Sequence, residues 1–256
     1  MAEPRIQTVS NVFAMLELLA ATDEPVAAKQ IAVSLGLSVN VVHRLLTALT
    51  SDDIVLMDPV RKTYAIGPEF LRLAAVSLRR SAFLRVSRAV MKELVRRADE
   101  TTCLNLYRPS DSQFSVQIVE ESAKALQYVL ETGTQFPLHA GAGGKAILAN
   151  LPPDVMEGIL TRKTLAKVTD HTVTSAAKLR SQLAEISAQG YAITYGERLE
   201  GAVGIAVPVF DERDMAVASL QFTIPLHRFE KARVPELVAL LREYSQKLTG
   251  LVQVAS

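Results

Sequence analysis

Residues 34–49 read SLGLSVNVVHRLLTAL, and this stretch decides the fold of the N-terminal part of the chain. Gly36 is expected to end one helix, because glycine reaches left-handed backbone angles at low cost. Ser38 is a good N-cap for the next helix, which we expect to extend to about Ser51. The apolar side chains of that helix recur at i, i+3, i+4 and i+7, namely Val42, Leu45, Leu46 and Leu49. Two helices joined by so tight a turn predict a helix-turn-helix.

The segments on either side extend this motif. Residues 8–21 carry apolar side chains at helical spacing, and a short second helix is expected over about 27–35. Two β-favouring runs at about 54–57 and 62–66 surround a proline-containing turn, which predicts a hairpin. This order of elements is that of a winged helix-turn-helix, so we assign residues 1–68 to a DNA-binding domain.

The third helix presents a polar face opposite its apolar stripe, because successive residues turn by about 100°. Asn can pair with adenine, Arg with guanine or a phosphate, and Thr with a thymine methyl group. Two cations at the tip of the hairpin lie where a wing contacts the phosphate backbone. Ordinary solvated helices also have such faces, but the place of this one within the winged motif favours DNA. The candidate DNA-binding residues are Ser38, Asn40, Val41, His43, Arg44, Thr47, Arg61 and Lys62.

The charge of the chain is close to balanced, which limits how one copy can bind DNA. The net charge is +1 over 256 residues, and residues 1–80 hold eight Lys and Arg against eight Asp and Glu. Affinity is therefore expected to depend on at least a homodimer, because a two-fold partner binds a palindromic double-stranded operator most tightly. A linking helix over residues 69–85 is expected to supply part of the interface. Its apolar candidates for that contact are Phe70, Leu73 and Leu78.

Residues 86–256 show a different pattern, in which strands and helices occur in mixed order. After a helix that ends near Ala98, strands are expected at 102–107, 113–119, 125–131, 191–195, 203–210 and 215–223. Helices are expected from the GGKAILAN segment, at 153–161, at 175–188 and from Pro235 onward, and TGTQFP (132–137) is expected to be a turn. This order predicts an α+β domain with a mostly antiparallel sheet flanked by helices.

Several stretches of the chain resemble the isocitrate lyase regulator (IclR) family of bacterial regulators. They are SLGLSVNVVHRLLTAL, the wing DPVRKTYAIGPEFLRLA (58–74), PLHAGAGGKAILANLP (137–152), GAVGIAVPVFDE (201–212) and ASLQFTIP (218–225). The helix and the His-Ala-x-x-x-Gly-Lys-Ala segment are the specific parts of the match, which covers nearly the whole chain. The resemblance implies a homodimer or a homotetramer (a dimer of dimers) whose N-terminal domains bind a palindromic operator. It also implies a GAF-like effector-binding domain, here residues 86–256, that binds a small organic metabolite.

The chain also departs from the family pattern. Val39, Asn40 and Val41 stand where the family usually has small hydroxyl residues, so a different operator sequence is expected. Gly204 stands where many members have cysteine or another residue, and the usual Ser-Val-Ser strand reads QFT (221–223). These differences bear on which effector is bound.

An anion-binding pocket is expected at the N-terminus of the helix that starts in GAGGKA (141–146), because free N–H groups and the helix dipole favour negative charge. Gln221 and Thr223 lie on one face of a strand and offer hydrogen bonds to the same cavity. Dinucleotide or Walker A binding is not expected, since Pro137 interrupts the preceding strand and Ala146 replaces Ser or Thr. Taken singly, each pocket candidate also fits ordinary sheet packing. The candidate effector-binding residues are Ala142, Gly143, Tyr195, Gly204, Gln221 and Thr223.

No catalytic residue, metal ligand or cofactor is predicted. Cys103 lies in TTCLNLY, where a buried small hydrophobe is favoured over a nucleophile, and no Cys and His residues recur at metal-ligand spacing. His139 and Lys145 fit structural roles, whereas His171 and His227 are expected in surface loops. The absence of a signal pattern and of any apolar run of about 18 residues predicts a cytoplasmic protein without a membrane partner.

The sequence thus predicts a ligand-responsive transcription regulator, expected to be a repressor, whose effector is a small organic acid or an aromatic metabolite. One alternative is an enzyme acting on a small acid, with the N-terminal unit as a protein-interaction module. That alternative requires clustered titratable groups in the pocket, and the strands predicted there carry none. A sensor that binds a partner protein instead of DNA is the other alternative.

Overall fold

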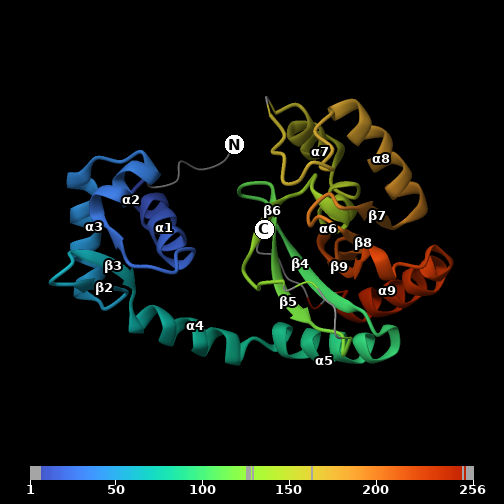
Figure 1. Ribbon diagram of the computed structural model, residues 1–256, viewed down its shortest axis with the longest axis horizontal. Helices are drawn as coiled ribbons and strands as arrows, with labels where there is room; N and C mark the ends of the chain where they lie inside the picture. The colour runs from blue at the N-terminus through green and yellow to red at the C-terminus, as the bar shows by residue number, and fades with distance from the viewer. Residues whose placement is uncertain (1–6, 125–127, 129, 163, 250, 252–256) are drawn as a thin grey trace. The chain divides into compact units, whose positions relative to one another are not determined.

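The chain divides after Ser81 into two units, Met1–Ser81 and Ala82–Ser256, in the computed structural model (Figure 1). The structure describes residues 7–124, 128, 130–162, 164–249 and 251. The sequence places domain boundaries at 68/69 and 85/86, and these exact positions stay predictions.

The N-terminal unit is a winged helix-turn-helix, as predicted. Its elements are α1 (Gln7–Ala20), β1 (Val26–Ala27), α2 (Ala28–Leu35), α3 (Val39–Ser51), β2 (Val55–Asp58), β3 (Thr63–Ile66) and α4 (Pro68–Arg80). Gly36 ends α2 at φ 64°, and the backbone N–H of Val41 donates to Ser38 Oγ at 3.4 Å. Both ends of the turn therefore form as the sequence predicts. The core of this unit is formed by fully buried side chains, among them Met15, Ile31, Val42 and Leu46.

The wing has one strand more than the sequence indicates. Strand β1 pairs antiparallel with β3, with Val26 opposite Tyr64, so the sheet order is β1-β3-β2. A two-residue strand is too short to show an alternating pattern, and the sequence analysis assigned Ala27 to the helix.

The expected linking helix is interrupted. Helix α4 ends at Arg80, Ser81 has extended backbone angles, and α5 (Ala82–Ala98) begins at once, earlier than the residue 86 expected from sequence. No residue of α4 is buried. Its apolar side chains Leu71, Leu73 and Leu78 are exposed in the described structure.

The C-terminal unit is built on a six-stranded sheet in the order β6-β5-β4-β9-β8-β7, in which all neighbours run antiparallel. The strands are β4 (Thr101–Arg108), β5 (Gln113–Glu120), β6 (Gln135–Pro137), β7 (Ala192–Tyr195), β8 (Ala202–Phe210) and β9 (Ala216–Pro225). The helices that follow α5 are α6 (Gly141–Leu148), α7 (Pro153–Leu160), α8 (Ala176–Gln189) and α9 (Val234–Leu248), with 3-10 turns at Leu226–Arg228 and Lys231–Arg233. The predicted α+β class is confirmed.

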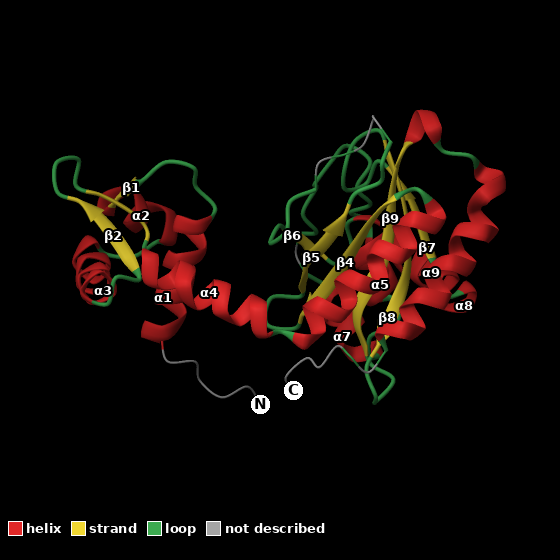
Figure 2. Cartoon of the chain, turned by 90° about the horizontal axis from the view of Figure 1, so that it is seen from below, coloured by secondary structure: helices red, strands yellow, loops and turns green. Residues whose placement is uncertain are grey.

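Helices cover both faces of this sheet (Figure 2). On one face, α5 and α9 pack on an apolar surface that includes Leu104, Leu220 and Phe222. On the other face lie α6, α7 and α8, whose apolar contacts include Phe114 and Ala206. The register places alternate residues of each strand on this second face, which is where polar side chains gather.

Two expectations for this unit need correction. The strand predicted over 125–131 falls partly on residues outside the described part of the chain, and its described residues Tyr128, Leu130 and Glu131 are not in a strand. The edge strand is instead β6, within the segment that the sequence analysis assigned to a turn. It is three residues long and contains a proline, a residue that sheets accept readily on an edge strand. Residues Gln135–Pro137 therefore form a strand although their composition is typical of a turn.

Among the described residues, no single helix is long and apolar enough to cross a membrane. Helices α2 and α3 meet that test only as a pair, bent by 117° at the turn between them.

Candidate functional site

The polar face of α3 is exposed along its length. Ser38, Asn40, His43, Arg44 and Thr47 are all exposed, while their apolar neighbours Val42, Leu45 and Leu46 are buried. The Thr47 hydroxyl donates to the carbonyl of His43 at 2.8 Å. Val41 differs from the other candidates because it packs partly against the core. The side chains free to reach a base edge are therefore Asn40, His43 and Arg44.

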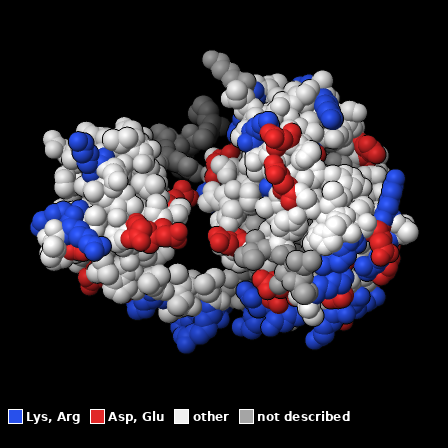
Figure 3. Space-filling view, viewed as in Figure 1, with Lys and Arg blue, Asp and Glu red and all other residues white. Residues whose placement is uncertain are grey.

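The wing tip is held in place by an aspartate. Asp58 Oδ1 accepts the backbone N–H groups of Val60 at 2.8 Å and Arg61 at 3.0 Å, and these hydrogen bonds lower the pKa of Asp58. Lys62 closes the turn with φ 55°. Arg61 and Lys62 are both exposed, and Figure 3 shows Lys and Arg side chains gathered at the end of the unit where the hairpin lies. This tip is suited to phosphate contacts.

A cavity lies between α6, the sheet and the loop that follows β7. Its space between atoms is about 230 Å³, including open solvent, and this space has room for about one water molecule. The residues that line it are Gly141, Ala142, Thr194, Glu197, Arg198, Leu199, Ala202, Gly204, Gln221 and Thr223. Its walls are thus small residues and hydrogen-bonding side chains.

The polar side chains behind the cavity are joined in a chain of hydrogen bonds. Asn105 Nδ2 donates to Ser219 Oγ at 3.1 Å and to Gln221 Oε1 at 3.3 Å. Gln221 Nε2 then donates to Thr223 Oγ1 at 3.0 Å. These side chains are almost fully buried, so the network fixes the orientation of the Gln221 amide.

Two glycines let the backbone approach this network. A Cβ at Gly143 would lie 2.4 Å from both Asn105 Nδ2 and Gln221 Oε1, so α6 can pack here only without a side chain. A Cβ at Gly204 would lie 3.1 Å from Ala142 Cβ and 3.4 Å from Gln221 Nε2. Gly204 therefore keeps part of the cavity open.

Arg198 lines the cavity but is not among the residues predicted from the sequence. It is only 6% exposed, Nη2 donates to Thr223 Oγ1 at 3.4 Å, and the guanidinium lies 5.1 Å from the centre of the Phe136 ring. Burial lowers its pKa, although an arginine stays protonated at neutral pH. It follows a strand in a loop, where no periodicity in the sequence assigns a side chain to a face.

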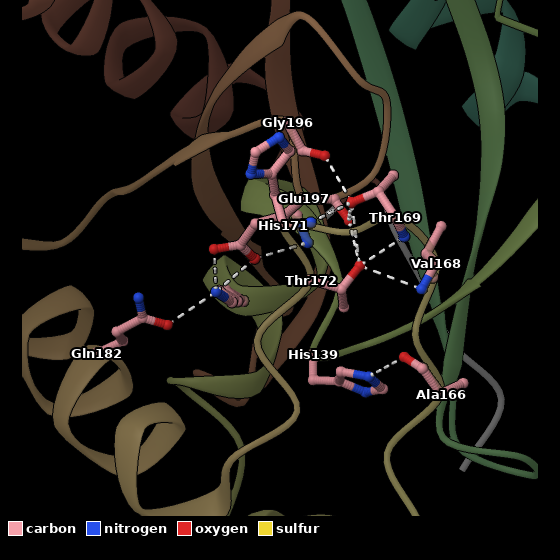
Figure 4. A network of polar contacts seen from close by, with 11 residues as sticks. His139, Ala166, Val168, Thr169, His171, Thr172, Gln182, Gly196 and Glu197 are labelled. Atoms are coloured by element: carbon pink, nitrogen blue, oxygen red, sulfur yellow. Dashed lines mark hydrogen bonds and ion pairs between the residues drawn. The ribbon is translucent and has the colours of Figure 1, made fainter.

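Next to Arg198, Glu197 forms a buried ion pair with Lys145 of α6. The distance from Lys145 Nζ to Glu197 Oε1 is 2.6 Å, and Lys145 Nζ also donates to Gln182 Oε1 at 2.8 Å (Figure 4). Burial lowers the pKa of Lys145, an effect that the Glu197 carboxylate opposes. Breaking such a pair is costly because one charge is left buried without a partner.

The backbone of the same loop is held by two threonines. Thr169 Oγ1 donates to the carbonyl of Gly196 at 2.7 Å, and Thr172 Oγ1 donates to the carbonyl of Glu197 at 2.7 Å. Figure 4 shows these hydrogen bonds on the side of Glu197 away from Gln182. The loop that carries Glu197 and Arg198 is thus attached both to the helices and to the segment before α8.

Four of the six predicted effector residues line the cavity, namely Ala142, Gly204, Gln221 and Thr223. Gly143 lies behind them, against Gln221. Tyr195 does not lie at the rim as expected, because its neighbour Thr194 points to the cavity and alternation along β7 turns Tyr195 away. Its ring packs edge-on against Phe229, with 5.8 Å between ring centres.

The N-terminus of α6 is not the open anion site that the sequence suggests. Glu197 Oε2 accepts the backbone N–H of Gly141 at 3.4 Å, so a carboxylate of the protein already lies at this end of the helix. The expectation failed because Glu197 is remote in sequence from α6. An anionic ligand would have to be attracted by another group.

The remaining titratable residues singled out from the sequence have structural surroundings. Cys103 is fully buried, and burial raises its pKa. A ring nitrogen of His139 lies 2.8 Å from the carbonyl of Ala166, and burial lowers the pKa of this histidine. His171 is packed against Gly196, and His227 lies in a 3-10 turn. No cluster of metal-ligating side chains occurs among the described residues.

A winged helix-turn-helix followed by an α+β unit with an internal polar cavity defines the class of one-component transcription regulators. Comparison with known proteins identifies the family. Residues 8–59 match the IclR helix-turn-helix domain, and residues 75–249 match the family described as bacterial transcriptional regulator IclR C-terminal. The chain belongs to the IclR family, which confirms the resemblance read from the sequence.

Individual relatives agree with this assignment. The glycerol operon regulatory protein of Streptomyces griseus is 32% identical, and the match covers 93% of each chain. Transcriptional repressor IclR of Escherichia coli is 25% identical over 97% of this chain and 90% of that protein. A crystal structure is known of an IclR homologue from Microbacterium hydrocarbonoxydans complexed with 4-hydroxybenzoate. The two sequences are 25% identical, and the match covers 94% of this chain and 97% of that chain with a TM-score of 0.75. The chain is a DNA-binding transcription regulator.

The buried ion pair gives the first testable prediction. Glu197→Gln should lower the free energy of unfolding by about 3–5 kcal/mol, because Lys145 would remain as a buried charge without a counter-charge. Urea unfolding of the whole chain, followed by circular dichroism, measures the change.

The surface pair between Glu157 and Arg180, with 2.7 Å between Oε2 and Nη2, provides the matched control. Glu157→Gln should move the unfolding midpoint much less, since exposed ion pairs contribute little. Lys145→Met combined with Glu197→Leu removes both charges and should regain most of the lost stability. Equal effects of the two Glu→Gln variants would show that the buried pair does not stabilise this loop.

Proposed function

We propose that this chain is a ligand-responsive repressor, in which the α3 face and the wing bind an operator and the cavity beside α6 binds a small organic acid or an aromatic metabolite. The observation that carries the proposal is the cavity itself, lined by hydrogen-bonding groups in a unit that has no part in the winged motif. The Microbacterium homologue in complex with 4-hydroxybenzoate supports a ligand of this class. The name of the Escherichia coli relative supports repression.

We also propose that the active species is a homodimer or a homotetramer that binds a palindromic operator. Two exposed apolar sets in the N-terminal unit support self-association. They are Val9 and Phe13 on α1, and Leu71, Leu73 and Leu78 on α4. Because the charge of one chain is balanced, self-association increases the number of phosphate contacts. The two-fold symmetry of a dimer also corresponds to the two-fold symmetry of a palindromic operator.

The mass of the particle in solution tests the oligomeric proposal. Light scattering at micromolar concentration is expected to give two or four times the 27.9 kDa of one chain. A single-chain mass together with full operator affinity would contradict it.

DNA binding is tested at Arg44. Arg44→Ala should weaken binding to the DNA upstream of the chain's own gene by about 1–3 kcal/mol if the guanidinium contacts a base, and lower the salt slope by about one if it contacts a phosphate. Fluorescence anisotropy at several salt concentrations separates the two cases. Arg213→Ala, an exposed cation in the β8–β9 turn, is the control and should leave affinity unchanged. Unchanged affinity of folded Arg44→Ala would favour the alternative in which this unit binds a protein.

The effector cavity is tested with Gln221→Ala combined with Thr223→Ala. This double variant should lose the effect of ligand on DNA binding while keeping its operator affinity without ligand, because two linked sites can be uncoupled separately. Ser87→Ala is the control, since Ser87 is a buried polar residue of α5 that does not line the cavity. Calorimetry against a panel of organic acids and aromatic metabolites measures binding directly. A metabolite that bound the double variant as tightly as the wild type would place the effector site elsewhere.

A further inference from the structure

We infer that Arg198 binds the acidic group of the effector and makes the cavity selective for ligands that carry a single carboxylate. The inference rests on the proposed effector function and deepens it, because it assigns the charge of the ligand to one residue.

The guanidinium of Arg198 has fewer partners than it can use. It carries five N–H donors, of which Nη2 reaches Thr223 Oγ1 at 3.4 Å, while Nη1 is buried without a hydrogen-bond partner within the described chain. The guanidinium lies over the face of the Phe136 ring, which accepts no strong hydrogen bond. A carboxylate satisfies two N–H groups of one guanidinium at once, which a hydroxyl or an amide oxygen does not.

No carboxylate of the protein neutralises this cation in the described structure. The adjacent Glu197 is engaged by Lys145 at 2.6 Å and by the N–H of Gly141 at 3.4 Å. Lys145, Glu197 and Arg198 together therefore leave one positive charge at the cavity. A buried cation without a counter-charge is costly, so a residue of this kind on a cavity wall indicates a ligand that brings the missing negative charge.

The rest of the wall limits the ligand further. Ala142, Ala202 and Gly204 offer small apolar contacts, and the neighbouring Thr194 and Gln221 offer hydrogen-bonding groups. The space of about 230 Å³ includes open solvent at the entrance of the cavity. It therefore fits a ligand of few atoms, unless the loop at 196–201 opens. A second carboxylate on the ligand would lie near Glu197, which also lines the cavity. The negative charge of Glu197 is already paired with the positive charge of Lys145. The geometry thus favours a small monocarboxylate with a polar or apolar tail.

Matched pairs of acids and amides test this assignment in the full-length chain. Acetate, propionate and benzoate differ from acetamide, propionamide and benzamide mainly in charge, so we expect the acids to raise the Tm of the wild type and the amides to leave it unchanged at equal ionic strength. Calorimetry should show the same order. Amides that act as strongly as acids would overturn the role of charge.

Substitution of Arg198 is the second part of the test. Arg198→Met should lose the response to the acids, by about tenfold or more in affinity, while its Tm without ligand stays equal to that of the wild type or rises, because a buried unpaired charge has been removed. A merely structural arginine would give the opposite result, a lower Tm. Arg198→Lys keeps the charge without the planar pair of donors and should retain a weakened response. Arg213→Gln controls for non-specific effects of anions.

The outcomes separate this inference from the proposed function. If a metabolite releases DNA through Gln221 and Thr223 and Arg198→Met responds like the wild type, only the role of Arg198 is overturned. If neither acids nor amides nor any metabolite of the panel act on the wild type, the cavity is not an effector site and both are overturned. Loss of the acid response in Arg198→Met, with its folding intact, supports both.

Discussion

The ion pair between Lys145 and Glu197 is the contact on which the effector unit depends. It joins the middle of α6 to the loop after β7, and Gln182 of α8 extends it to a third element. Two charges this deeply buried are stable only with close geometry and further hydrogen bonds, which Gln182 and the N–H of Gly141 supply. The position of Arg198, one residue further along the loop, follows from this contact.

The cavity exists because one face of the sheet is partly polar and the helix that covers it is made of small residues. A side chain at Gly143 would collide with Asn105 and Gln221, and a larger residue at Gly204 would fill the space in front of Gln221. Hydrogen bonds join Asn105, Gln221 and Thr223 side chain to side chain, and these bonds hold the buried amides in one arrangement. The same rigidity that stabilises the face also orients the groups offered to a ligand.

Regulation requires that ligand and operator favour different states of the protein. An effector changes operator affinity only to the extent that it binds one state more tightly than another. The covalent connection between the two units is α4 followed by α5, with Ser81 as the only non-helical residue between them. The threonine contacts to Gly196 and Glu197 tie the cavity loop to the segment before α8.

The sequence by itself determined the winged helix-turn-helix, since Gly36, Ser38 and the apolar stripe of α3 act over a few residues and depend on local backbone preferences. It also determined most strands of the effector unit and the shared face of Gln221 and Thr223, because alternation along a strand is a local property. Only the tertiary structure decided that Glu197 occupies the start of α6 and that Arg198 lies on the cavity wall. Those outcomes depend on contacts between segments some 50 residues apart, such as Gly141 with Glu197, and no local pattern of residues encodes them.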